Sequence, residues 1–191
     1  KFSGTGVALI TPFNNDKSID FNSLEKLVEF VINGGVDFLV VLGTTGETTS
    51  LNDKEQNDVI NCIKKTNNYR LPMILGIGGN NTSNVLEKIF STDLSFFEAI
   101  LSVTPYYNKP TQEGLYQHYK AISSVSPIPI ILYNVPSRTS VNLSAETTLR
   151  LANDFSNIVA IKEASGDLDQ IKNILQNKSS NFYVLSGDDG L

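Results

Sequence analysis

Short apolar runs recur along the chain, and the segments between them carry apolar residues spaced three and four positions apart. Runs of this length, rich in β-branched residues, predict buried strands, and the 3–4 spacing predicts amphipathic helices. The starts of successive runs are separated by 24 to 34 residues, about the length of one βα unit. We therefore predict seven strands, at residues 6–11, 38–43, 72–78, 99–105, 127–135, 158–163 and 182–187.

Polar residues and glycines mark where the predicted helices begin and end. Asn52 followed by Glu55 predicts a capping box at the start of the second helix, and Ser144 predicts a cap for the fifth. Gly34 and Gly35 end the first helix. The apolar stripes of the first two helices are Leu24, Leu27, Val28 and Val31, and Val59, Ile60 and Ile63.

Alternating strands and helices predict a parallel sheet covered by helices. Seven strands fit either an open doubly wound sheet or a (β/α)8 barrel, which needs eight units and typically about 250 residues. The chain has 191 residues and ends just past the seventh strand. We predict an α/β fold, a (β/α)8 TIM barrel truncated after strand seven. Residues 1–191 would form a single catalytic domain that is incomplete at its C-terminus.

Composition narrows the choice of partners. Hydrophobic residues make up 40% and charged residues 18% of the chain, as in globular proteins. A net charge of −5 without a long basic block argues against nucleic-acid binding. The single cysteine, Cys62, suits a reducing compartment. With no apolar run of about 20 residues and no signal peptide, we expect a cytoplasmic protein without a membrane partner.

Lys162 ends the apolar run at residues 158–161. An ammonium group at the end of a buried strand loses water, and desolvation lowers the pKa of a lysine. A lysine that is partly neutral near pH 7 attacks carbonyl carbon and can form a Schiff base. The alternative is a lysine whose aliphatic stem lines the strand while its ammonium group reaches solvent.

Two further strand ends carry polar motifs, and the carboxyl ends of strands are where a parallel barrel gathers its reactive groups. Residues 43–47 (GTTGE) combine two glycines with hydroxyl and backbone N–H groups that can hold a carboxylate. The alternative is a tight turn with capping threonines. Residues 104–110 place Tyr106 and Tyr107 in a stiff loop between prolines. These phenols fit either an active site or an aromatic lid or interface patch.

The end of the fifth strand adds a third polar motif, residues 133–139 (YNVPSRT). Tyr133 can shuttle protons, and Arg138 suits bidentate carboxylate binding. The alternative is a core tyrosine with a surface arginine. Together with Lys162 and the two threonines of residues 43–47, these groups suit Schiff-base chemistry on a keto acid.

Other chemistries fit the sequence less well. Residues 76–81 follow the third strand, but Asn81 replaces the last glycine of a dinucleotide-binding motif, so we interpret them as a turn. His118 lies on a predicted helix away from the strand ends, and we interpret it as a surface or interface residue. One histidine and one cysteine cannot build the usual zinc site. The adjacent acids at 188–189 are typical of a turn or cap rather than a Mg²⁺ site.

Taken as a set, these motifs resemble the dihydrodipicolinate synthase family of pyruvate-dependent class I aldolases. The resemblance covers essentially all 191 residues. The GTTGE turn and the lysine of strand six are shared with the wider superfamily, including the N-acetylneuraminate lyases, whereas Tyr106, Tyr107 and Arg138 indicate the synthase branch. The matching stretches are residues 43–47, 103–110 (VTPYYNKP), 133–139, 161–164 (IKEA) and 186–189 (SGDD).

The resemblance implies an enzyme that condenses pyruvate with L-aspartate 4-semialdehyde, on the pathway to diaminopimelate and lysine. The reaction would proceed through a covalent pyruvate imine on a lysine and would need no metal or organic cofactor. Members usually form homotetramers made of two tight dimers. The implied catalytic residues are Lys162, Tyr133, Thr44 and Tyr107, and the implied substrate-binding residues are Thr45, Arg138 and Gly187.

Each residue has an implied role. Lys162 would attack C2 of pyruvate while Tyr133 moves protons during imine and enamine formation. Thr44 would link Tyr133 to Tyr107, which a neighbouring subunit would deliver. Thr44 and its neighbour would hold the pyruvate carboxylate, and Arg138 would bind the carboxylate of the semialdehyde.

Two alternatives stay open. One is a related pyruvate aldolase acting on a sugar-acid aldehyde, like the N-acetylneuraminate lyases or the keto-deoxy sugar acid aldolases. Arg138 argues against it, because a neutral polyol gains nothing from a guanidinium. The other is a non-catalytic barrel fragment. The family's lysine-feedback site also differs here, and we expect only weak lysine inhibition. Its positions are Thr48, Asp53, Gln56, Asn80, Asn84 and Tyr106.

Overall fold

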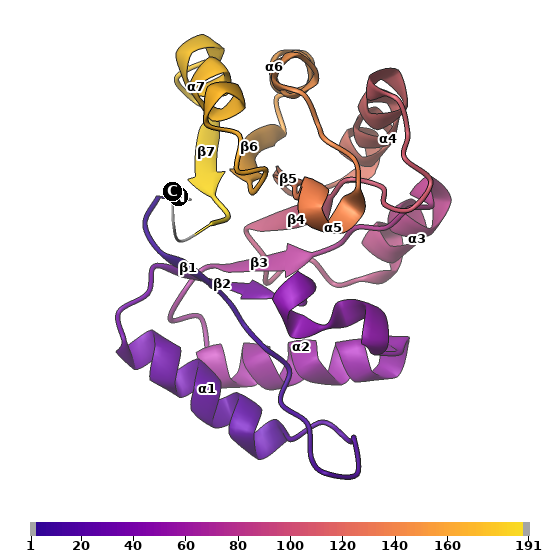
Figure 1. The fold of residues 1–191 in the computed structure, drawn as a ribbon. Helices are drawn as coiled ribbons and strands as arrows, with labels where there is room; N and C mark the ends of the chain where they lie inside the picture. The colour runs from indigo at the N-terminus through magenta and orange to yellow at the C-terminus, as the bar shows by residue number, and fades with distance from the viewer. Residues whose placement is uncertain (1–2, 189–191) are drawn as a thin grey trace. The chain divides into compact units, whose positions relative to one another are not determined.

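A computed structural model describes residues 3–188, in which parallel strands alternate with helices along the chain (Figure 1). The strands are β1 (Gly6–Ala8), β2 (Phe38–Val41), β3 (Met73–Gly76), β4 (Ala99–Val103), β5 (Ile130–Asn134), β6 (Ile158–Glu163) and β7 (Tyr183–Ser186). The helices are α1 (Phe21–Asn33), α2 (Asp53–Asn67), α3 (Thr82–Ser91), α4 (Gln112–Val125), α5 (Pro136–Thr139), α6 (Ala145–Asp154) and α7 (Leu168–Asn177), with short 3-10 turns η1 (Thr44–Gly46) and η2 (Thr48–Ser50).

The described residues divide into two compact units. The first unit consists of residues 3–76 and 95–98 and contains β1 to β3. The second consists of residues 77–94 and 99–188 and contains β4 to β7. All seven predicted strands are present, so the βα spacing in the sequence located every strand correctly.

In the first unit, β1 pairs with β2 and β2 with β3, all in parallel. Every residue of β2 is buried, as expected for a strand covered on both faces. The predicted apolar stripes of α1 and α2 pack inward, except that Leu27 is only half-buried. The buried members are Leu24, Val28 and Val31 on α1, and Val59, Ile60 and Ile63 on α2.

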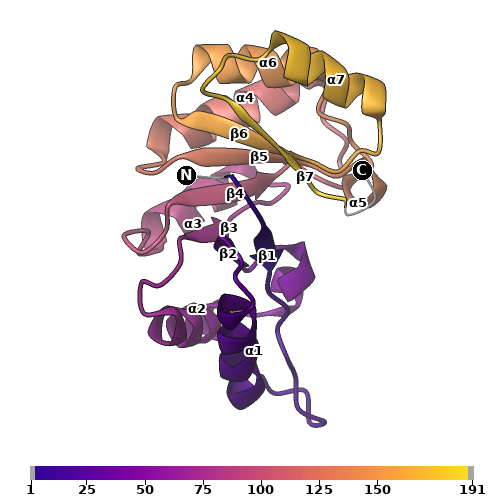
Figure 2. The ribbon, with the colours of Figure 1, turned by 90° about the vertical axis from the view of Figure 1, so that its left-hand side faces the viewer.

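In the second unit, β4, β5, β6 and β7 pair in sequence order, again in parallel. All five residues of β5 are buried. Helices α4, α6 and α7 lie side by side over the sheet (Figures 1 and 2). The carboxyl ends of β5 and β6 are thereby held in a packed interior.

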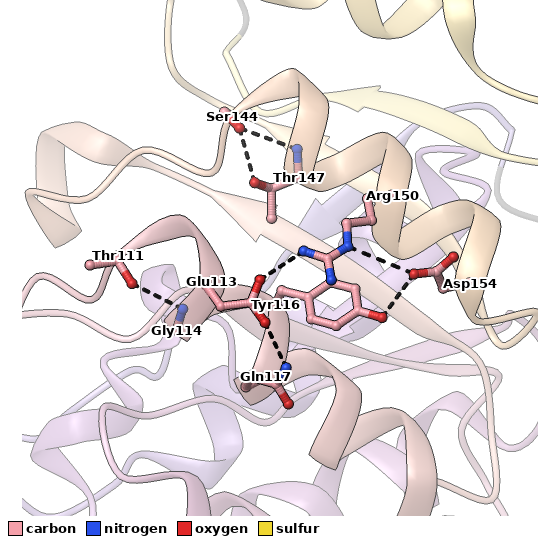
Figure 3. Close-up of polar contacts among 9 residues, drawn as sticks. All are labelled: Thr111, Glu113, Gly114, Tyr116, Gln117, Ser144, Thr147, Arg150 and Asp154. Carbon is pink, nitrogen blue, oxygen red and sulfur yellow. Dashed lines mark hydrogen bonds and ion pairs between the residues drawn. The ribbon is translucent and has the colours of Figure 1, made fainter.

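A polar network joins α4 to α6 on the outer surface of the second unit (Figure 3). The Arg150 guanidinium lies 3.6 Å from the centre of the Tyr116 ring and 2.8 Å from Glu113 Oε2. The Tyr116 hydroxyl donates to Asp154 at 2.8 Å. Hydrogen bonds from Gln117 and Arg150 lower the pKa of Glu113. These contacts fix the two helices that cover β5 and β6.

The predicted helix ends are confirmed. Asn52 and Glu55 form a reciprocal capping box on α2, with Glu55 N–H donating to Asn52 Oδ1 at 2.9 Å. Ser144 caps α6 through Thr147 N–H. Helix α1 ends at Gly34, and the following glycine has a φ of +81°, which a side chain would oppose.

The interpretation of His118 as a surface or interface residue is wrong. Its side chain lies on α4 and is only 4% exposed, with Nδ1 2.8 Å from Thr82 Oγ1 of α3. α4 turns this face toward α3 and the sheet, and the imidazole fills the space between the two helices. Burial lowers the pKa of His118 to about 4, so the ring is neutral at pH 7.

Candidate active site

Lys162 and Tyr133 lie next to each other at the carboxyl ends of β6 and β5. They are partners in the parallel ladder. The Lys162 Nζ lies 4.6 Å from the centre of the Tyr133 ring. Tyr133 is 7% exposed and Lys162 is half-buried. The structure therefore brings the predicted nucleophile and the predicted proton carrier together at neighbouring strand ends.

Gly187, directly after β7, leaves room for the Lys162 side chain. Its N–H donates to the Glu163 carbonyl at 2.8 Å, which extends the ladder past the strand. A Cβ at this position would lie 3.0 Å from Lys162 Cε and 2.7 Å from Ala164 Cβ. Both approaches are closer than normal packing allows. A glycine is therefore needed here for the lysine to keep its position.

Asn134 and Glu163 follow Tyr133 and Lys162, so they point to the opposite face of the sheet. Both are buried. Asn134 Nδ2 donates to the two carboxylate oxygens of Glu163 at 3.0 and 3.2 Å. Sequence reasoning missed this pair. The sequence does carry a signal for it. Asn134 and Glu163 are polar residues at the ends of two apolar strands, and each directly follows a predicted site residue.

Arg138 and Tyr107 are carried by segments that follow β5 and β4 in the same unit. Arg138 is exposed on α5, which begins with Pro136 at its first turn. Tyr107 is 85% exposed, with a φ of +73°, which is strained for an aromatic residue. Both side chains reach solvent and can meet a ligand or another chain.

Thr44 and Thr45 lie in the first unit, where they open the 3-10 turn η1 after β2. The turn closes through Gly46 N–H to the Gly43 carbonyl at 3.0 Å. The hydroxyl of Thr48 donates to the Leu42 carbonyl at 2.6 Å and so links the residues on either side of the turn. The first N–H groups of a helical turn have no partner inside it, and here they belong to two exposed threonines. This backbone arrangement suits an anion such as a carboxylate.

Other site types find no support within residues 3–188. No group of three or more histidine, cysteine or acidic residues is placed to hold a metal ion. No helix in this stretch has the length and apolar character needed to cross a bilayer. Asp188 is exposed, and Asp189 lies outside the described residues.

Fold and strand-end chemistry together define a parallel α/β protein with a lysine and a tyrosine side by side at the ends of two strands of its second unit. Its first unit carries, after β2, a turn whose backbone suits an anion. The chain belongs to the dihydrodipicolinate synthetase family, whose sequence model matches residues 1–191. The family resemblance inferred from the motifs is confirmed.

Curated relatives include 4-hydroxy-tetrahydrodipicolinate synthases from Flavobacterium psychrophilum and Bacillus subtilis. The first is 56% identical over 98% of this chain and 64% of its own length, and the second is 46% identical over 100% and 66%. This chain therefore spans slightly less than two thirds of these relatives.

Solved structures of family members superpose closely on the chain. The 4-hydroxy-tetrahydrodipicolinate synthase of Methylacidiphilum fumariolicum SolV gives a TM-score of 0.95 at 37% identity, over 100% of this chain and 63% of that one. Dihydrodipicolinate synthase from Thermotoga maritima gives 0.94 at 43% identity, over 98% and 64%. These matches confirm the predicted α/β class and the (β/α)8 barrel fold, of which the described residues contain seven strands.

Proposed function

We propose that the protein, at its full natural length, condenses pyruvate with L-aspartate 4-semialdehyde to give 4-hydroxy-tetrahydrodipicolinate, a step toward diaminopimelate and lysine. Relatives at about half sequence identity are named for this synthase. The observation that carries the proposal is the pairing of Lys162 with Tyr133, an amine beside a phenol at the ends of two buried strands.

The proposed reaction begins with the Lys162 amine attacking C2 of pyruvate. Loss of water from the carbinolamine gives an imine, and loss of a C3 proton gives an enamine. The enamine carbon then bonds to the aldehyde carbon of the second substrate. Attack by that substrate's own amine on the imine carbon closes the ring and releases Lys162. Covalent attachment splits one difficult carbon–carbon bond formation into easier steps.

The remaining residues take supporting roles in this proposal. Tyr133 carries protons to and from the carbinolamine and enamine, because its hydroxyl belongs to the ring beside the Lys162 amine. Thr44 and Thr45 hold the pyruvate carboxylate, and Thr44 connects Tyr133 to Tyr107. In this proposal, Thr44 and Thr45 belong to the same site as Lys162.

The second substrate and the assembly complete the proposal. The Arg138 guanidinium binds the semialdehyde carboxylate through two parallel N–H bonds, and Gly187 lies beside the bound substrate. The lysine imine supplies the chemistry without a metal or organic cofactor. The protein acts in the cytoplasm as a homotetramer of two dimers, in which Tyr107, exposed here, enters the site of a neighbouring copy.

Borohydride trapping tests the proposal. Incubating the full-length protein with pyruvate and reducing it is expected to leave one covalent adduct on Lys162, located by peptide mass spectrometry. Lys162→Arg keeps the positive charge but cannot form the imine under these conditions, and it should show neither adduct nor turnover. Lys120, an exposed lysine on α4, serves as the internal control for nonspecific labelling. An unmodified Lys162 in the wild-type protein would refute the proposed function.

A further inference from the structure

Behind the proposed site lies a buried carboxylate that the reaction itself does not use. Glu163 is 1% exposed, and Asn134, its partner across the β5–β6 ladder, is 0% exposed. Burying a carboxylate is costly unless hydrogen bonds replace the lost water. The hydrogen bonds described for Glu163 come from neutral amide groups. These amides determine which side chain can occupy position 163.

Backbone groups set the direction of the Asn134 and Gln170 side-chain amides. Leu143 N–H donates to Asn134 Oδ1 at 2.9 Å, which turns Asn134 Nδ2 toward Glu163. The Leu143 carbonyl accepts from Gln170 Nε2 at 3.2 Å, and the same nitrogen donates to Glu163 Oε2 at 3.0 Å. Ser165 N–H donates to Glu163 Oε1 at 2.9 Å. Backbone groups cannot exchange donor for acceptor, so both carboxylate oxygens face donors.

Only a side chain with two acceptor oxygens satisfies this arrangement. A glutamine would present an NH₂ group to one set of donors. This change would leave a buried donor without an acceptor. The geometry at position 163 therefore suits a glutamate and not its amide.

The segments joined by Glu163 are the ones that carry the proposed site. Its bonds to Asn134 hold the ends of β5 and β6 together, directly after Tyr133 and Lys162. The bond from Leu143 to Asn134 closes a loop over residues 134–143, and this loop contains α5 with Arg138. A single carboxylate thus ties together the strands of the amine and phenol and the segment of the guanidinium.

We infer that Glu163 is a positioning residue, whose buried carboxylate fixes Lys162, Tyr133 and the Arg138 segment in one reactive arrangement. The inference rests on the proposed function. Catalytic groups displaced by about 1 Å can lose about a hundredfold in rate. Loss of the Glu163 hydrogen bonds should therefore slow the chemical steps far more than it weakens pyruvate binding. The threonines that would hold the pyruvate carboxylate lie in the other unit.

The test replaces the carboxylate with a group of the same shape. In the full-length protein, Glu163→Gln is expected to lower kcat and the rate of borohydride-trapped imine formation by about tenfold or more. The KM for pyruvate should change by less than about threefold. The KM for the semialdehyde should rise, because the Arg138 segment is held by the same cluster. This separation of kcat from the pyruvate KM is a readout that general loosening of the fold would not produce.

Two further variants keep the test decisive. Tyr116→Phe removes the hydrogen bond from the Tyr116 hydroxyl to Asp154, which lies in the same unit on the outer helices, away from the strand ends. This variant should leave kcat and the rate of imine trapping unchanged. Gln170→Met removes one donor to Glu163 from a partly exposed helix position, and should slow trapping about threefold even if Glu163→Gln does not fold.

The outcomes distinguish this inference from the proposed function. A wild-type protein without an adduct on Lys162 refutes the function. A labelled wild type with Glu163→Gln trapped at the same rate overturns the inference alone. Equal slowing by Tyr116→Phe and Gln170→Met would also overturn it, because the effect would then be a general loss of packing.

Discussion

At the scale of single residues, His118 gives the clearest pH prediction. Its pKa in the folded chain is about 4, against 6.5 for an unperturbed histidine, because the ring is desolvated. The unfolded chain therefore binds the extra proton first. The stabilisation is complete above about pH 6.5 and is lost as the pH falls toward 4. Between pH 7 and pH 5 it amounts to about 2 kcal/mol of unfolding free energy.

Urea unfolding at pH 7 and pH 5 measures this contribution. His118→Gln keeps an amide that can reach Thr82 but removes the titrating ring, so its unfolding free energy should vary less between the two pH values by about the same 2 kcal/mol. Buried carboxylates affect both proteins alike and cancel in the comparison. An equal pH dependence of variant and wild type would contradict the prediction.

Arg138 carries a prediction about substrate choice. Arg138→Ala should raise the KM for the semialdehyde by about a hundredfold, because a bidentate guanidinium–carboxylate pair contributes roughly 2 to 3 kcal/mol. Pyruvate trapping on Lys162 should continue at a similar rate, since α5 carries no part of the imine chemistry. Steady-state kinetics with each substrate varied in turn, beside the trapping assay, gives both numbers. An unchanged semialdehyde KM, with activity on a sugar-acid aldehyde, would favour the alternative aldolase.

Single residues were predictable where strand periodicity alone decides their position. Lys162 and Tyr133 end apolar runs, and the ladder pairs them as expected. The role of Glu163 was not predictable in this way, because it depends on Leu143 and Gln170, which only folding brings near. His118 was misjudged for a similar reason: a helix position becomes buried when a neighbouring helix covers it.

At the scale of elements, local signals located every strand and gave the bounds of the sixth correctly, but they overestimated the length of the other six. The fifth strand was predicted over 127–135, whereas β5 spans Ile130–Asn134. Pro127 and Pro129 lack the N–H group that a ladder needs, so pairing begins only after them. Helix α5 was not predicted, because four residues are too few to show a helical period.

Helix caps were predicted well, because they depend on neighbouring residues, and this makes the α2 cap a test at the element scale. Asn52→Ala removes the side-chain half of the capping box, the bond from Glu55 N–H to Asn52 Oδ1, and should cost about 1 kcal/mol of unfolding free energy. Asn22→Ala, in the first turn of α1, is the matched control, because Asp20 rather than Asn22 caps that helix. Denaturant unfolding of both variants measures the difference, and equal stabilities would contradict the assigned cap.

At the scale of the whole molecule, the regular βα repeat made the fold class predictable, because the repeat is visible without any tertiary contact. Subunit assembly was not predictable in the same way. In the proposed tetramer it would depend on surfaces such as the loop of Tyr107, which is 85% exposed and would meet a neighbouring copy. The φ of Tyr107 is strained, and strained backbone of this kind clusters at functional segments. The sequence alone does not show this strain.

A closed barrel needs eight βα units, and the described residues contain seven strands. Leu168 and Leu175 on α7 are 51% and 49% exposed, and Tyr183 on β7 is 40% exposed.

We therefore expect the isolated chain to turn over the two proposed substrates at less than about 1% of the full-length rate, because small displacements of catalytic groups cost about two orders of magnitude. The comparison requires both proteins at equal concentration, in the same assay, with circular dichroism to confirm that each is folded. Borohydride trapping on the same samples then shows whether the loss begins at imine formation. Turnover by the isolated chain near the full-length rate would mean that seven strands suffice to hold Lys162 and its neighbours in place.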